Sequence, residues 1–128
     1  MDLKVGDVMS WRRTFAEEDI LRFADLTGDR GRHHLDPDEG GRRMAHGLLT
    51  ASLATKIGGD LDYIARQMVM EFLRPVFAGD TITCDVTVTH VAQQDGYRDV
   101  ALRSVYRNQH GKEVLVGTSH GIIRDTFR

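Results

Sequence analysis

Residues 46–57 read HGLLTASLATKI, and this stretch carries no acidic or basic side chain between His46 and Lys56. At 3.6 residues per turn its apolar side chains cover most of a helix surface, and a helix that is apolar nearly all round is buried. The pattern predicts a buried helix over 46–57, ended by the glycine pair 58–59. The apolar positions are Leu48, Leu49, Ala51, Leu53, Ala54 and Ile57.

The chain after this helix changes from helical spacing to alternation of apolar and polar residues. Alternation is typical of a strand with one buried face. It is clear over 81–89 and 100–107, weaker over 68–72, and a last apolar run covers 114–123. We therefore predict four strands in an antiparallel meander. The residues expected to face the core are Ile82, Cys84, Val86, Val88, Val100, Leu102 and Tyr106.

The segment before the buried helix predicts a short strand, one amphipathic helix and a loop. Thr14 and Glu17 have capping-box spacing, and Gly28 is a natural helix end. Residues 28–43 are polar and rich in glycine, as in a loop. A sheet wrapped around one apolar helix is an α+β arrangement with two open edges. Because edges are often paired across a two-fold axis, we expect a homodimer.

Composition excludes several classes of protein. The 128 residues fit one domain spanning 1–128, and a formal charge of −2 does not suggest a nucleic-acid partner. No run approaches the roughly 20 apolar residues that span a bilayer, and the N-terminus lacks an apolar signal core. The single cysteine excludes an internal disulfide. We expect a cytoplasmic protein with no membrane contact, no resident metal and no cofactor.

The loop GDRGRHHLD, residues 28–36, places a carboxylate and an imidazole five residues apart. Histidine exchanges protons near neutral pH, and a neighbouring carboxylate can orient it or share its chemistry. Asp29 and His34 are therefore candidates for an acid–base pair, although Asp29 could equally close the turn after the first helix. A metal site built from His33, His34, Asp29 and Asp36 matches no established ligand spacing.

Two further features adjoin this loop. The first N–H groups of any helix lack helical partners, so the Gly47 amide is a candidate oxyanion donor, while the alternative is that Gly47 only permits close packing. Arginines gather nearby, and such a cluster suits either a phosphate-bearing ligand or a salt-bridged surface. The arginines are Arg30, Arg32, Arg42 and Arg43.

These motifs resemble, in order, those of the MaoC-like, (R)-specific enoyl-CoA hydratases. Residues 28–36 resemble the family's Gly-Asp-x-Asn-Pro-x-His-x-Asp, with Gly31 and Arg32 replacing its asparagine and proline. Residues 46–49, HGLL, resemble His-Gly-Met-Leu, and residues 72–81, FLRPVFAGDT, resemble Phe-x-x-Pro-Val-x-x-Gly-Asp.

The resemblance implies a dimeric hot-dog fold with active sites at the dimer interface. It implies Asp29 and His34 as the catalytic pair and the Gly47 amide as the thioester oxygen donor. Thr55 falls where the family often has a positioning serine, and we assign Gly31, Arg32 and Thr55 to substrate binding. The implied substrates are trans-2-enoyl and (R)-3-hydroxyacyl thioesters on coenzyme A or an acyl carrier protein. Two alternatives stay open: a hot-dog thioesterase, and a non-catalytic acyl-thioester-binding subunit.

Overall fold

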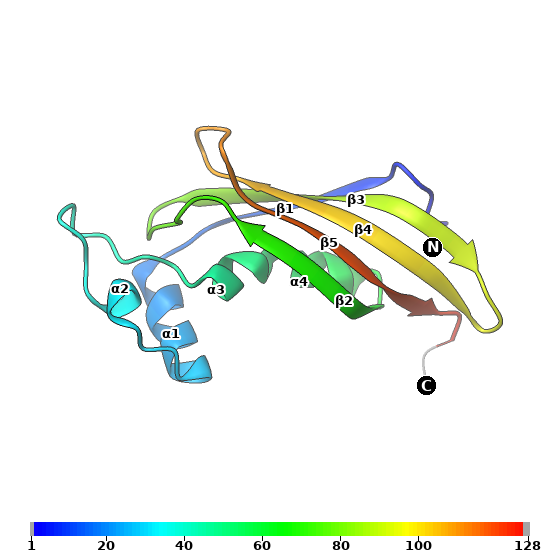
Figure 1. Ribbon diagram of the computed structural model, residues 1–128, viewed down its shortest axis with the longest axis horizontal. Coiled ribbons are helices and arrows are strands. Elements are labelled where there is room, and N and C mark those ends of the chain that lie inside the picture. Colours follow the sequence, from blue (N-terminus) through cyan, green and yellow to red (C-terminus); the bar gives the residue numbers. More distant parts are fainter. Residues whose placement is uncertain (1, 127–128) are drawn as a thin grey trace.

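The computed structural model describes residues 2–126 as one curved antiparallel sheet with helices against its concave side (Figure 1). The strand order is β1-β3-β4-β5-β2. The elements are β1 (Val8–Thr14), α1 (Glu17–Thr27), α2 (Arg32–Leu35), α3 (Gly47–Ala51), α4 (Leu53–Asp60), β2 (Tyr63–Phe72), β3 (Thr81–Gln93), β4 (Tyr97–Arg107) and β5 (Glu113–Arg124).

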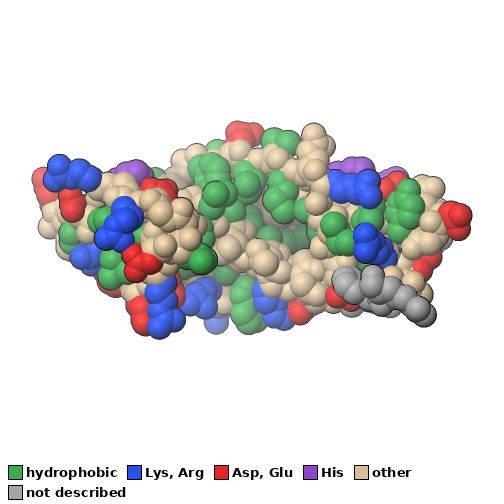
Figure 2. Space-filling view, turned by 90° about the horizontal axis from the view of Figure 1, so that it is seen from below, with side chains coloured by type: hydrophobic (Ala, Val, Ile, Leu, Met, Phe, Trp, Pro, Cys, Tyr) green, Lys and Arg blue, Asp and Glu red, His purple; other side chains and the backbone are tan. Residues whose placement is uncertain are grey.

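The core lies between the sheet and the helices α3 and α4. Alternate residues of β3 and β4 face it, which confirms the strand patterns predicted over 81–89 and 100–107. Cys84 is fully buried, which confirms that this cysteine is a core residue, and burial raises the pKa of its thiol to about 11. Seen from the helix side, the molecule is hollowed near its middle, with hydrophobic side chains around the hollow (Figure 2).

The predicted four-strand meander is wrong in one respect, because β2 does not pair with β3. β3, β4 and β5 form the meander, and β2 pairs with β5 at the far edge of the sheet. Gly121 of β5 allows this approach, since a Cβ there would lie 2.2 Å from the Ile64 carbonyl oxygen of β2. Residues 73–80 then cross from the β2 edge to β3, past the start of α3.

The predicted capping box of Thr14 and Glu17 is also wrong. Thr14 belongs to β1, where its hydroxyl hydrogen-bonds to the Thr81 hydroxyl at 2.6 Å. The α1 helix begins at Glu17, and the residue before it, Ala16, is the N-cap. The Ala16 amide donates to the Asp19 carboxylate at 2.9 Å. Burial raises the pKa of Asp19, but the Ala16 amide and the Arg13 guanidinium outweigh it and hold the pKa below its usual value. Gly28 ends α1 with φ of 80°, as expected.

The helix predicted over 46–57 is interrupted at Ser52 and continues past the glycine pair to Asp60. At the break, the Thr55 amide donates to the Ser52 carbonyl at 2.9 Å, a tighter turn that frees the Ala51 carbonyl. The Tyr106 hydroxyl of β4 donates to that carbonyl at 2.7 Å. The break therefore gives the sheet a polar anchor on the central helix.

We predict that Tyr106→Phe destabilises the fold by about 1–3 kcal/mol, because the Ala51 carbonyl loses its partner in the core. Urea unfolding followed by circular dichroism measures the change. Tyr97→Phe is the matched control, since no hydrogen bond of the Tyr97 hydroxyl is recorded among residues 2–126. Equal stability of the Tyr106→Phe variant and the parent would contradict the proposed anchor.

Candidate active site

Asp29 lies where the chain leaves α1. Its carboxylate Oδ1 accepts from the Gly31 amide at 3.2 Å, and Oδ2 lies 3.6 Å from Nε2 of His34. This separation is slightly too long for a direct hydrogen bond. The Asp29 side chain is 55% exposed, whereas the His34 side chain is only 6% exposed.

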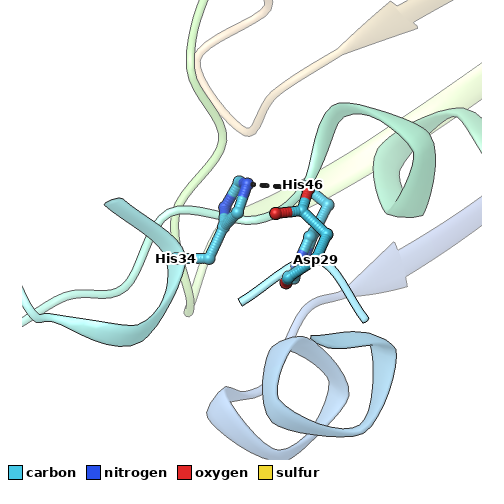
Figure 3. A group of neighbouring side chains, drawn as sticks. All are labelled: Asp29, His34 and His46. Atoms are coloured by element: carbon cyan, nitrogen blue, oxygen red, sulfur yellow. Dashed lines mark hydrogen bonds and ion pairs between the residues drawn. The ribbon is translucent and has the colours of Figure 1, made fainter. Parts of the chain in front are cut away.

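His34 is carried by the single turn of α2, and one hydrogen bond and two ring contacts hold its side chain. Its Nδ1–H donates to the Met44 carbonyl at 2.8 Å, which in the neutral ring leaves Nε2 as a lone-pair acceptor facing Asp29. The His46 ring stacks on one face with centroids 3.8 Å apart, and the His33 ring lies 3.8 Å from the His34 centroid at a tilt. The ring therefore has a fixed direction (Figure 3).

The segment that orients His34 is itself tied to the crossing connection between β2 and β3. The Ala45 amide donates to the Val76 carbonyl at 2.7 Å, and the Ala78 amide donates to the Arg43 carbonyl at 2.9 Å. Met44 lies between these two bonds and presents its carbonyl to His34. The sequence stretch 72–81 thus acts on the site through the backbone.

A cavity of about 390 Å³ lies against His34, and Gly47 lines it as well, whereas Asp29 is not among its lining residues. No acceptor for the Gly47 amide is recorded among residues 2–126, as is normal for the first residue of a helix. A Cβ on Gly47 would lie 2.7 Å from Cε1 of Phe72, so close packing also requires glycine here. The two interpretations of Gly47 are compatible.

The other predicted substrate-binding residues occupy different surroundings. Thr55 lines a second, largely apolar cavity of about 480 Å³ between α4, β2 and the sheet. The Arg32 side chain is 93% exposed and pairs with Asp36 at 2.9 Å. Gly31 packs closely against the His33 ring. A Cβ at position 31 would lie 2.9 Å from His33 Cε1. Substrate binding by these three residues stays a prediction.

The arginine cluster is paired with carboxylates throughout, which favours its interpretation as a salt-bridged surface. Arg43 also donates to the Leu35 carbonyl at 2.8 Å and so ties α1 to the loop after α2. The pairs are Arg30 with Asp25, Arg32 with Asp36, Arg42 with Asp38 and Arg43 with Glu17.

His46 is the residue of the site that sequence reasoning does not single out. Asp29, His34 and His46 each offer a ligand atom, all within 4.8 Å of one another. The geometry does not suit a metal ion: the two imidazole planes differ by only 20°, so their in-plane lone pairs run side by side and do not converge. In addition, His46 Nε2 lies 2.9 Å from the Asp29 carbonyl and must donate to it.

The fold and this site define a hot-dog protein with a carboxylate–imidazole pair at the N-terminal end of its central helix. The chain belongs to the MaoC-like domain family, whose model matches residues 7–109. None of the helices within residues 2–126 is long and apolar enough to cross a membrane.

Comparison with known proteins gives relatives of two kinds. An (R)-specific enoyl-CoA hydratase of Rhodospirillum rubrum is 36% identical over 98 residues, covering 69% of this chain and 67% of that protein. The structure of R-hydratase PhaJ1 from Pseudomonas aeruginosa superimposes with a TM-score of 0.84 at 27% identity, covering 95% of this chain and 82% of that one. The acyl-coenzyme A thioesterase PaaI of Escherichia coli is 37% identical over 59 residues, covering 46% of this chain and 41% of that protein.

We predict that Gly47→Ala costs about 1–3 kcal/mol of stability, because the added methyl group overpacks against Phe72. Combining it with Phe72→Leu should recover part of that loss, since the shorter side chain leaves room for the methyl group. Urea unfolding of the two single variants and the double variant gives the coupling energy. Strictly additive costs would show that Phe72 is not the obstacle.

Proposed function

We propose that this chain hydrates trans-2-enoyl thioesters and, in the reverse direction, dehydrates (R)-3-hydroxyacyl thioesters. The observation that carries the proposal is the approach of Asp29 Oδ2 to His34 Nε2 beside a cavity that His34 shares with Gly47. The relatives named hydratases support the same reaction class. The thiol of the substrate is coenzyme A or an acyl carrier protein.

The chemistry requires one group that takes a proton and one that gives a proton. In hydration, the Asp29 carboxylate takes a proton from water as the water oxygen bonds to C3 of the substrate. The electrons of the C2–C3 double bond move toward the thioester, and C2 receives a proton from His34, protonated at Nε2. Transfer of the proton from Asp29 to His34 Nε2 then restores both groups. Charge that develops on the thioester oxygen is stabilised by the Gly47 amide, at about 3–4 kcal/mol for such a donor.

The different surroundings of the two groups suit this division. Asp29 is half exposed, so water can reach its carboxylate, which as an anion can only accept hydrogen bonds. His34 is buried and anchored through Nδ1, so its proton exchange is confined to Nε2, the atom that faces Asp29.

We predict that Asp29→Asn and His34→Ala each lower the rate of crotonyl-CoA hydration by about 10²–10⁴-fold, because each removes one proton-transfer group. Loss of enoyl absorbance measures the reaction. Asp95→Asn and His110→Ala, both at exposed turns, are matched controls that should keep the parent rate. Parent-like turnover of either site variant would refute the mechanism.

A thioesterase is the second candidate, because PaaI matches part of this chain. The same experiment separates the two reactions when butyryl-CoA is included and free thiol is measured. Hydration consumes crotonyl-CoA without releasing thiol, whereas hydrolysis releases thiol from the saturated butyryl-CoA. Absence of both reactions would favour a non-catalytic acyl-thioester-binding subunit.

We further propose that two copies of the chain pair through the β2 edge. β2 is an edge strand of the sheet, and the segment from it to residue 73 exposes large apolar side chains. An exposed apolar edge is a template for a second strand. The exposed fractions are 60% for Met68, 56% for Val69, 53% for Phe72 and 45% for Leu73.

We predict that the protein sediments with the mass of two 14.4 kDa chains, and that Met68→Glu weakens the dimer by about tenfold or more. The physical reason is that pairing would bury an unpaired carboxylate. Val8→Glu changes an equally exposed residue on the opposite edge strand and should leave the dimer intact. A monomeric parent, or dissociation only by Val8→Glu, would contradict pairing through β2.

A further inference from the structure

His46 contacts both members of the proposed catalytic pair and directly precedes the third group, Gly47. Its ring is buried, at 2% exposure, and it stacks on His34 with an interplanar angle of 20°. On its own edge, Nε2 lies 2.9 Å from the main-chain carbonyl oxygen of Asp29. Because a carbonyl only accepts, the hydrogen of the neutral His46 ring is on Nε2.

The other nitrogen of His46 shows that packing alone does not explain this residue. Nδ1 is buried, and among residues 2–126 it is the one buried side-chain nitrogen or oxygen without a hydrogen-bond partner. A buried polar atom without a partner lowers stability, so an apolar ring of similar shape would serve packing better. The feature that a phenyl ring could not supply is the hydrogen bond to Asp29.

That hydrogen bond acts where the backbone has little other support. Asp29 follows Gly28, which has a positive φ, and therefore lies beyond the helical hydrogen bonds of α1. The Asp29 amide reaches the Thr27 hydroxyl at 3.2 Å, and the His46 bond fixes the carbonyl at the other end of the residue. Because the amide and the carbonyl of Asp29 are both held, the backbone fixes the point from which its carboxylate extends toward the His34 imidazole.

Stacking of the His46 ring acts on His34, the partner of the Asp29 carboxylate. The Met44 carbonyl fixes the His34 ring at its Nδ1 edge, but one hydrogen bond leaves the ring free to tilt about that edge. The His46 ring stacks on His34, and it also contacts the Phe23 ring, with centroids 4.9 Å apart. Phe23, in turn, is carried by α1, the helix that ends just before Asp29.

We propose that His46 is a positioning residue that sets the Asp29–His34 separation by bonding the backbone of one and stacking on the ring of the other. This inference rests on the proposed hydratase function. His46 does not transfer a proton itself, since its Nε2–H is committed to a carbonyl and its Nδ1 is enclosed.

Three variants separate the two contacts. His46→Leu removes both, and we expect kcat for crotonyl-CoA hydration to fall about 100-fold with a much smaller change in KM, because reacting groups displaced by about 1 Å lose about that much rate. His46→Gln keeps a donor without the stacking ring, and His46→Phe keeps the ring without the donor. Each should recover part of the loss. His110→Gln, at an exposed turn, is the matched control for replacing a histidine.

Nitrogen-15 spectra of the histidine rings provide a readout that does not depend on activity. We expect the parent to show a protonated Nε2 and an unprotonated Nδ1 for His46, and the His46→Phe variant to lack that protonated signal. A His46 ring protonated at Nδ1 alone would overturn the proposal, whatever the activity.

The outcomes are distinguishable from failure of the proposed function. A parent protein without hydratase activity would refute the function, and the spectra would then decide the His46 hydrogen bond alone. With an active parent, an unchanged kcat in folded His46→Leu would overturn the positioning role. So would equal losses in all three variants at matched thermal stability, because neither contact would then rescue catalysis. If His46→Leu does not fold, the comparison rests on Gln, Phe and the parent.

Discussion

The site depends on two main-chain hydrogen bonds that join residues 43–45 to residues 76–78. They bring a loop from the first half of the chain against the connection between β2 and β3. Three consequences follow within four residues: the Met44 carbonyl meets His34, His46 reaches Asp29, and Gly47 opens the central helix. Because backbone bonds hold this segment, its geometry depends little on which side chains occupy the loop before it.

The same arrangement gives the two candidate acid–base groups, Asp29 and His34, opposite environments at a short separation. His34 is enclosed by two other imidazoles and a carbonyl, while the Asp29 carboxylate meets solvent on one side. An enclosed ring with one free nitrogen exchanges its proton in a single direction, whereas a half-exposed carboxylate can recruit water. Such asymmetry suits the addition of water across a double bond that we propose for this site.

Gly31, one of the two departures of residues 28–36 from the family pattern, is coupled to the neighbouring His33. A side chain at position 31 would meet the His33 ring, and that ring in turn lies against His34. Glycine at 31 and histidine at 33 are therefore compatible with each other, because the His33 ring takes the space that a side chain at 31 would need. His33 thereby adds a ring contact to His34, which also stacks on His46.

The sequence by itself determined the α+β class, the buried faces of β3 and β4, and the end of α1 at Gly28, because alternation and glycine act over neighbouring residues. It also singled out Asp29 and His34, which share one loop. Only the tertiary structure decided that β2 joins β5, that the central helix breaks where Tyr106 meets Ala51, and that His46 links the pair. The physical reason is that each of these features is a contact between segments far apart in the chain, which no local pattern encodes.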